Sequence, residues 1–207
     1  MKPTILGRAT SANVQKVLWL LEEMGLAAER VDVGGSFGGN REPAYLRRNP
    51  TGLVPTLIDG EHAVWESNTI LRYLANTRGP TPLYPVDPLQ RSQVERWMDW
   101  QLGALNGAIT PLFWALVRTP PERRDAAAIE QNRAKTAQHL AVLDGVLGER
   151  AHVASDAFSL ADIAIGAQVY RWYEMPIERP PLANLERWYR SMRTRTGFQT
   201  HVMIGLS

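Results

Sequence analysis

Short apolar runs alternate with helical periodicity over the first eighty residues of the chain. Thr4–Leu6 and Glu29–Val33 have the character of short strands. Between them, apolar residues recur at helical spacing from Val14 to Met24 and stop at Gly25, a residue type common at helix C-termini. The pattern predicts a strand–helix–strand unit at the start of the chain.

A helix, a hairpin and another helix follow this unit. The first helix is expected through Ala44–Leu46, and strands over Val54–Ile58 and Ala63–Trp65 flank a glycine-containing turn in the manner of a β-hairpin. Ser67–Thr77 has helical spacing of its apolar residues. Strands that alternate with helices indicate an α/β layer, and the hairpin makes its sheet mixed rather than purely parallel.

A proline-rich segment at residues 79–88 ends this pattern. Four of its ten residues are prolines, which is typical of a linker. No convincing strand follows, and apolar spacing predicts helices over Leu89–Val117 (bent near Pro111), Arg123–Leu147, Ser159–Trp172 and Leu182–Met192, with a short one after Gly197. We therefore expect an α/β domain over residues 1–78, a linker over 79–88 and an all-helical domain over 89–207.

Composition and charge narrow the class of protein. The 207 residues include no cysteine, which excludes a disulfide framework and a cysteine nucleophile and fits a reducing compartment. Residues 1–80 carry 9 Lys and Arg against 8 Asp and Glu, and residues 81–207 carry 14 against 13, so no basic face indicates a nucleic-acid partner. The longest uncharged stretch, Leu102–Val117, is shorter than the roughly 20 residues of a membrane span. A soluble, cytoplasmic protein is expected.

Several motifs have a structural explanation. The glycine-rich segment 34–39 lacks the Lys-Ser/Thr pair of a phosphate-binding loop, and the four histidines form no metal-spaced pair, so no metal ion is expected. Ser159-x-x-Asp162 matches a helix capping box. One predicted helix carries Trp97, Trp100 and Trp114. These tryptophans could pack in the core or line an apolar ligand pocket, and the sequence does not decide between the two roles.

The most informative residues lie late in the first domain. Pro55 stands before a strand and is a candidate for a cis peptide bond, which turns the N–H and C=O of Val54 outward to pair with an extended peptide. Ser67, at a helix start, offers O–H and N–H groups to a carboxylate, and Glu66 beside it can bind an ammonium group. Together these groups predict a site for a zwitterionic amino-acid terminus joined to a peptide bond.

Four segments carry a resemblance to a known family over nearly the whole chain. They are Ser11-x-Asn13-x-x-Lys16-Val17, Asn49-Pro50-Thr51-Gly52-Leu53-Val54-Pro55, Glu66-Ser67-x-x-Ile70-x-x-Tyr73-Leu74 and Ser159-x-x-Asp162. In this combination and order they resemble the cytosolic glutathione transferases. The resemblance implies a thioredoxin-like α/β N-terminal domain with a mixed sheet, an all-α C-terminal domain, glutathione as cosubstrate and a homodimer.

The resemblance also implies residues that bind glutathione. Val54 resembles the residue that pairs with the cysteinyl backbone, and Glu66 and Ser67 resemble the pair that binds the γ-glutamyl group. Asn40 resembles the polar residue near the glycyl carboxylate. Asp99 resembles a residue that reaches the glutathione of a partner subunit.

The residue that acts on sulfur defines the class within this family. The end of the first strand has no tyrosine, the chain has no cysteine, and Ser11 stands where serine-type, theta-like and related bacterial members place their catalytic hydroxyl. Asn13 resembles the asparagine that bacterial nu-like members use near the sulfur, in place of the proline common in theta-like chains. Helix N-capping is the other interpretation of Ser11 and Asn13, and both roles can coexist.

The implied function is a detoxifying glutathione transferase that conjugates the glutathione thiolate to small electrophiles, for example halogenated ones. Trp97, Trp100, Trp114 and Arg118 are expected to line the pocket for the electrophile. Two other functions stay open. One is a glutathione-dependent disulfide reductase or peroxidase, and the other is a non-enzymatic protein that binds hydrophobic ligands.

Overall fold

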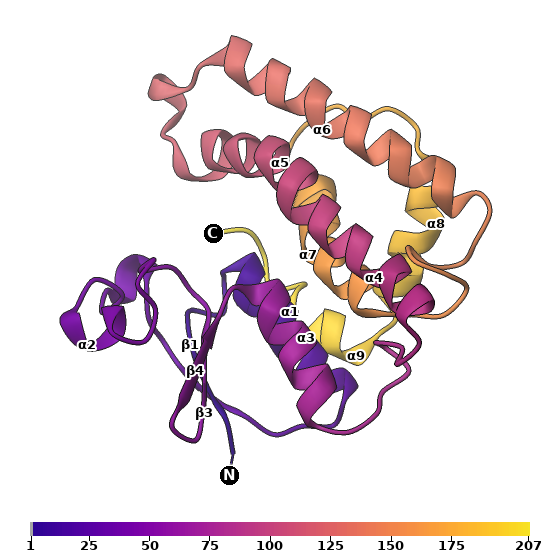
Figure 1. The fold of residues 1–207 in the computed structure, drawn as a ribbon. Helices are drawn as coiled ribbons and strands as arrows, with labels where there is room; N and C mark the ends of the chain where they lie inside the picture. Colours follow the sequence, from indigo (N-terminus) through magenta and orange to yellow (C-terminus); the bar gives the residue numbers. More distant parts are fainter. Residues whose placement is uncertain (1) are drawn as a thin grey trace. The chain divides into compact units, whose positions relative to one another are not determined.

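The computed structural model describes residues 2–207, which form two compact units. The N-terminal unit takes the chain up to Thr81 together with Thr196–Ile204, and the C-terminal unit takes Pro82–Arg195 together with Gly205–Ser207. The path of the backbone through each unit can be followed in Figure 1. The units differ from the expected domains in two segments: Thr196–Ile204 packs with the N-terminal unit, and the expected linker 79–88 is divided between the units after Thr81.

A mixed sheet forms the centre of the N-terminal unit. In chain order its strands are β1 (Thr4–Leu6), β2 (Glu29–Val31), β3 (Thr56–Asp59) and β4 (His62–Trp65), and in space the order is β2-β1-β3-β4. β1 is parallel to β2, with Ile5 opposite Arg30, and antiparallel to β3, with Ile5 opposite Leu57. The predicted mixed sheet is confirmed, although β2 ends before the expected Val33.

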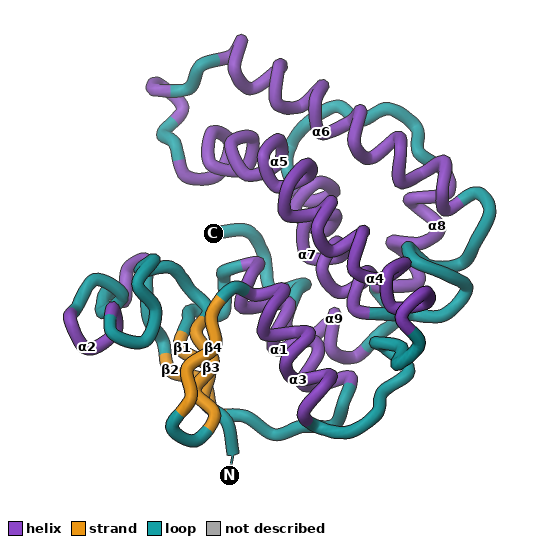
Figure 2. The backbone as a smooth tube through the Cα atoms, viewed as in Figure 1, coloured by secondary structure: helices purple, strands orange, loops and turns teal. Residues whose placement is uncertain are grey.

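Helices α1 and α3 lie on the same side of this sheet (Figure 2). The helices of the unit are α1 (Ala12–Glu23), α2 (Pro43–Leu46), α3 (Ser67–Thr77) and α9 (Thr196–His201). Val17 and Leu20 of α1 and Leu71 and Leu74 of α3 are fully buried. This apolar face fixes where α1 and α3 begin relative to the ends of the strands.

Helix α9 packs on α1. The ring of Phe198 meets Trp19 edge-on, with centroids 4.9 Å apart, and both side chains are fully buried. A Cβ at Gly197 would lie 2.6 Å from Cδ1 of Trp19, so this glycine permits the close approach of the two helices. The packing explains why α9 belongs to the N-terminal unit.

The C-terminal unit is helical. Its elements are α4 (Pro88–Trp100), α5 (Asn106–Phe113), α6 (Ala126–Leu147), α7 (Leu160–Glu174) and α8 (Ala183–Met192), with π-helical turns at Gln101–Leu105 and Trp114–Arg118 and a 3₁₀ turn at Pro121–Arg123. The all-helical prediction is confirmed for this part of the described chain. None of the described helices is long and apolar enough to span a membrane.

The predicted long helix corresponds to the run from α4 through α5, which contains π-helical turns on both sides of Pro111, while Pro111 itself lies inside α5; the bend near Pro111 stays a prediction. One predicted helix start was wrong. The expected start of α6 at Arg123 forms a 3₁₀ turn instead, because Asp125 accepts the N–H of Ala128 at 3.0 Å and begins the helix there.

Helix α7 is the buried centre of the C-terminal unit, and its start confirms the predicted capping box. The N–H of Ser159 donates to Oδ2 of Asp162 at 2.9 Å. The other carboxylate oxygen, Oδ1, accepts from Nε1 of Trp188 at 2.8 Å and from the N–H of Val153 at 3.0 Å. Asp162 is 0% exposed, so this one carboxylate joins the start of α7 to α8 and to the preceding loop.

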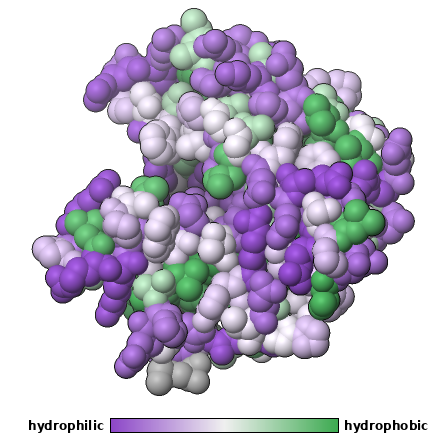
Figure 3. Space-filling view, in the orientation of Figure 1, coloured by the Kyte–Doolittle hydropathy of each residue, from purple (hydrophilic) through white to green (hydrophobic). Residues whose placement is uncertain are grey.

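On the face drawn in Figure 3, hydrophobic residues form small separate groups among hydrophilic ones.

Candidate functional site

The loop before β3 holds the peptide bond between Val54 and Pro55 in the cis form, as the sequence predicts. Val54 is half-buried. Outside the strand ladders, no backbone hydrogen bond among residues 2–207 engages its N–H or C=O. Both groups are therefore available to a ligand with an extended peptide backbone.

Asn49 holds this loop in shape from inside. Its side chain is 1% exposed, and its Nδ2 donates to the carbonyl of Leu53 at 2.8 Å and to Oγ1 of Thr56 at 3.0 Å. The hydroxyl of Tyr45 contacts the same Oγ1 at 2.8 Å. These bonds fix the backbone on both sides of Val54.

Asn40 contacts the same loop. Its Nδ2 donates to the carbonyl of Gly52 at 2.7 Å. Gly52 has a φ of +63°, a conformation that favours glycine, and a Cβ there would lie 3.1 Å from the carbonyl oxygen of Asn40. Asn40 thus supports the segment that carries Val54, and its contact with a glycyl carboxylate stays a prediction.

Glu66 precedes α3 in an unusual conformation. Its φ of 68° is the only positive φ of a non-glycine residue in the described chain. Such a backbone costs roughly 1–3 kcal/mol and occurs often at functional sites. The side chain is exposed, and among residues 2–207 its carboxylate has no hydrogen-bond or ion-pair partner. The Glu66 carboxylate is therefore available to a cationic group, and its contact with an ammonium group stays a prediction.

Ser67 is the first residue of α3, and its hydroxyl joins α3 to α1. Its Oγ donates to Oδ1 of Asn13 at 3.3 Å and accepts from Nζ of Lys16 at 3.4 Å. The same Nζ donates to Oδ1 of Asn68 at 3.2 Å. The structure therefore brings together two predicted site residues, Asn13 and Ser67, from helices more than fifty residues apart in sequence.

Lys16 is the residue to which the sequence assigned no role. Lys16 is 0% exposed, which is rare for a lysine, and its ammonium donates to Oγ of Ser67 from inside the protein. The signal was present, since Lys16 follows Asn13 by three residues and so shares its helix face.

Ser11 is the N-cap residue of α1, yet its side chain makes no capping hydrogen bond. Its carbonyl accepts the N–H groups of Val14 and Gln15, both at 2.9 Å, so the backbone alone begins the helix. Ser11 as a whole is buried, with 8% of the residue exposed. The hydroxyl is left to act on a ligand at the positive end of α1.

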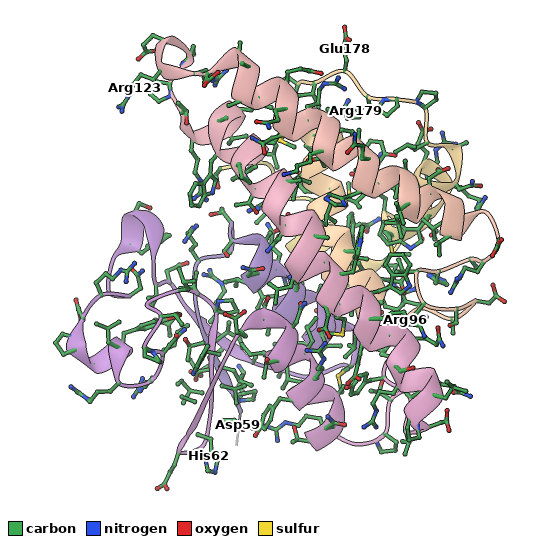
Figure 4. All side chains as sticks on the ribbon, turned by 45° about the horizontal axis from the view of Figure 1, so that its top comes forward. Asp59, His62, Arg96, Arg123, Glu178 and Arg179 are labelled. Carbon is green, nitrogen blue, oxygen red and sulfur yellow. The ribbon has the colours of Figure 1, made fainter. Side chains whose placement is uncertain are left out.

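Tyr73 anchors α3 to the β-hairpin. Its hydroxyl donates to Oδ2 of Asp59, which Figure 4 labels, at 2.9 Å, and Arg78 pairs with the same carboxylate. Burial raises the pKa of Asp59, but the hydrogen bonds from Tyr73 and Arg78 outweigh it and hold the pKa below its ordinary value. The bond to Asp59 in turn raises the pKa of Tyr73.

The residues predicted for the electrophile pocket fall into two groups within the C-terminal unit. Trp97 and Trp100 pack edge-on, with centroids 5.1 Å apart. Trp114 is 54% exposed, and Arg118 lies over the ring of Phe113 with its Cζ 5.3 Å from the centroid. About 25 Å of helix separates Trp97 from Trp114 at about 1.5 Å per residue. Their common pocket stays a prediction.

Asp99 lies on α4 of the C-terminal unit and is exposed. Its predicted role in reaching a partner's glutathione stays a prediction. Within residues 2–207, no group of three or more His, Cys, Asp or Glu side chains is placed to hold a metal ion.

Comparison with known proteins gives a consistent family. Residues 1–76 match the family model described as the N-terminal domain of glutathione S-transferase, and residues 105–195 match its C-terminal domain. Glutathione S-transferase GstB of Escherichia coli strain K12 is 40% identical over 206 residues, which cover 99% of each chain. Probable glutathione S-transferase GSTF2 of Oryza sativa is 31% identical over 77% of this chain and 76% of its own length.

A solved structure agrees with these sequence relatives. The crystal structure of the theta class glutathione S-transferase from Xanthomonas axonopodis pv. citri, with glutathione bound, has a TM-score of 0.96, 45% sequence identity and 99% coverage of both chains. The two family models, the full-length relative and the site built from α1, α3 and the loop before β3 lead to one conclusion: the chain belongs to the glutathione transferase family and is an enzyme of that family.

Proposed function

We propose that the chain conjugates glutathione to small electrophiles such as halogenated compounds. The thiolate sulfur forms a bond to an electrophilic carbon, the leaving group departs with the electron pair of its own bond, and the thiol proton passes to solvent. One observation carries the proposal: the Val54 backbone, the Glu66 carboxylate and the Ser11 hydroxyl all lack partners among the described residues. The names of the relatives support the same reaction.

Recognition of glutathione is divided among three groups of the N-terminal unit. The Glu66 carboxylate binds the γ-glutamyl ammonium, and the N–H of Ser67 binds its carboxylate at the positive end of α3, while the O–H of Ser67 donates to Asn13. The N–H and C=O of Val54 pair with the cysteinyl backbone. We assign Asn40 as the polar residue near the glycyl carboxylate of glutathione.

Ser11 and Asn13 stabilise the thiolate. A thiol with a pKa of about 8.5 is only a few per cent ionised at neutral pH, and lowering that pKa by two units takes about 2.7 kcal/mol of differential stabilisation. The Ser11 hydroxyl supplies one charge-assisted hydrogen bond. Because Oδ1 of Asn13 accepts from Ser67, the Nδ2 of Asn13 is the group left to donate to sulfur.

Lys16 acts as a positioning residue in this proposal. Its ammonium donates hydrogen bonds to the side chains of Ser67 and Asn68, and the Ser67 hydroxyl in turn donates to Asn13. The γ-glutamyl site and the sulfur site are thereby linked through one buried cation.

The remaining parts of the proposal extend beyond the N-terminal unit. Trp97, Trp100, Trp114 and Arg118 are the residues we propose for the electrophile, and a homodimer is the proposed assembly, with Asp99 near the partner's glutathione. Light scattering that gives a mass near twice 23.2 kDa supports the dimer, and a mass near 23.2 kDa contradicts it. A role in detoxification and a cytoplasmic location stay predictions.

A panel of electrophiles tests the reaction. With glutathione and an aryl or alkyl halide, the protein should form a thioether, and Ser11→Ala should lower kcat/KM about 10- to 150-fold, the effect of one hydrogen bond to a charge. Ser36→Ala, which changes an exposed serine of the same unit, should leave the rate unchanged. If Ser11→Ala keeps the rate and Asn13→Ala abolishes it, the catalytic role belongs to Asn13.

Turnover of disulfides or peroxides without thioether formation would favour a reductase or peroxidase instead. Binding of hydrophobic ligands without any turnover would favour a ligand-binding protein.

A further inference from the structure

A cleft in the C-terminal unit lies where the end of α7 faces α8, and its volume is about 600 Å³. Its lining consists of three arginines, two tyrosines, two prolines and one glutamate. None of the residues proposed above for glutathione or the electrophile belongs to it. Cavities of about 300–1,000 Å³ are typical of sites for small organic ligands.

Arg179 is held in this cleft by backbone carbonyls, and Figure 4 labels it on the segment between α7 and α8. Its Nε donates to the carbonyl of Trp172 at 2.8 Å, and its Nη2 donates to the carbonyl of Tyr173 at 2.8 Å and to that of Met175. Nη1 has no hydrogen-bond partner among residues 2–207. The Nε and Nη2 atoms of the guanidinium therefore bind backbone carbonyls, and the N–H groups of Nη1 are left to donate to an anion.

Tyr173 and Tyr189 give the cleft an aromatic wall. Their rings stack with centroids 4.4 Å apart and an angle of 17° between planes. Cζ of Arg179 lies 5.8 Å from the Tyr173 centroid, and Cζ of Arg193 lies 5.8 Å from the Tyr189 centroid. Burial raises the pKa of both phenols, so neither adds a negative charge at neutral pH.

The charge of the lining favours an anion. Three arginines against one glutamate give a net charge of +2 at pH 7. Glu186, the carboxylate of the lining, pairs with Arg190 at 3.2 Å. An anion with a flat apolar body matches both the charge and the aromatic wall.

We propose that this cleft binds a planar aromatic carboxylate. The carboxylate pairs with Arg179 and Arg193, and the ring packs against the tyrosines. The proposal uses only residues of the C-terminal unit, so it does not depend on the proposed glutathione chemistry.

Calorimetry with the full chain and 2-naphthoate as probe tests the site. We expect 2-naphthoate to bind and the neutral 2-naphthamide to bind at least tenfold more weakly, because the amide lacks the charge. Arg193→Ala should weaken the binding of 2-naphthoate about tenfold, and Glu186→Gln should strengthen it severalfold by removing the competing carboxylate. Arg96→Ala, which removes an equal charge from an exposed position outside the lining, should leave the affinity unchanged.

Opposite results overturn the proposal. Arg193 and Glu186 lie at exposed and half-buried positions, so both variants should fold, and circular dichroism checks this. If both bind 2-naphthoate as the parent does, or if saturating glutathione displaces the probe, the cleft is not the site. If inorganic phosphate binds as tightly as 2-naphthoate, the aromatic part of the proposal is wrong.

Discussion

The start of α7 and the starts of α1 and α3 use similar residues in opposite ways. At α7, the N–H and O–H of Ser159 both lie within hydrogen-bond distance of Asp162, which also accepts from Trp188 and Val153. At α1, the hydroxyl of the N-cap Ser11 makes no capping bond. At α3, the N-cap Glu66 has a positive φ and no side-chain cap.

This difference indicates that some helix starts in the fold contribute to stability and others contribute to ligand binding. A helix start whose polar side chains are all paired stabilises the folded state, because it satisfies N–H groups that the helix leaves without partners. A helix start whose N-cap side chain is left unpaired gives up that stabilisation and keeps the group for a ligand. We therefore expect changes at α7 to affect folding and changes at α1 and α3 to affect glutathione.

The largest effect is expected at α7. Asp162→Ala leaves the buried donors of Trp188, Val153 and Ser159 without an acceptor, and each such donor costs about 1–3 kcal/mol. The free energy of unfolding, measured in urea, should fall by about 3–5 kcal/mol. Asp125→Ala is the matched control, because this exposed aspartate caps α6 through Ala128 alone and should cost about 1 kcal/mol. Equal losses in the two variants would contradict the contrast.

Lys16→Met tests the link between α1 and α3. The buried ammonium orients Ser67, so its loss should raise the KM for glutathione about tenfold or more, while Lys135→Met, an exposed lysine on α6, should leave KM unchanged. Steady-state kinetics with varied glutathione measure this. A KM equal to that of the parent would show that Lys16 does not position the γ-glutamyl site.

Glu66→Gly should change stability and binding in opposite directions. Glycine accepts a φ of 68° without strain, so the variant should gain about 1 kcal/mol in the free energy of unfolding. It also lacks the carboxylate, so the affinity for glutathione should fall about tenfold. Glu66→Gln separates the two effects, since it loses affinity but keeps the strain. A loss of stability in Glu66→Gly would contradict the account of the backbone.

The smallest effect is expected for Asp59, whose contribution to stability depends on pH. The folded-state pKa of Asp59 lies below its unfolded value, so its contribution to stability is present above about pH 4 and is lost as the pH falls through the folded pKa. Asp59→Asn should therefore lower the melting temperature slightly at pH 7 and not at all at the lowest pH where the protein folds. A difference that grows as the pH falls would contradict this sign.

The sequence predicts more of the fold than of the site. The mixed sheet, α3 and the cap of α7 follow from local patterns, because apolar periodicity and turn residues act over a few positions. The start of α6 at Asp125 was missed, since Pro120 and Pro121 offered a second start signal nearby. The packing of α9 on α1 was missed because Gly197 and Trp19 are distant in sequence.

The site shows the same limit. The residue types at Val54, Glu66 and Ser67 already indicate a peptide-like ligand, but the positive φ of Glu66 and the burial of Lys16 arise only from tertiary structure. The contact between Asn13 and Ser67 likewise depends on the packing of α1 beside α3. A serine at a helix start looks the same in sequence whether its hydroxyl is paired, as at Ser159, or left unpaired, as at Ser11.

The pKa of the bound glutathione thiol in Ser11→Ala tests the central claim most directly. Thiolate absorbance titrated against pH gives this value, and the free energy of unfolding of the same variant comes from urea titration. We predict that the thiol pKa rises by about one to two units toward the free value near 8.5, while the free energy of unfolding changes by less than about 0.5 kcal/mol. An unchanged thiol pKa together with a loss of about 1 kcal/mol or more in stability would show that Ser11 is only a helix cap.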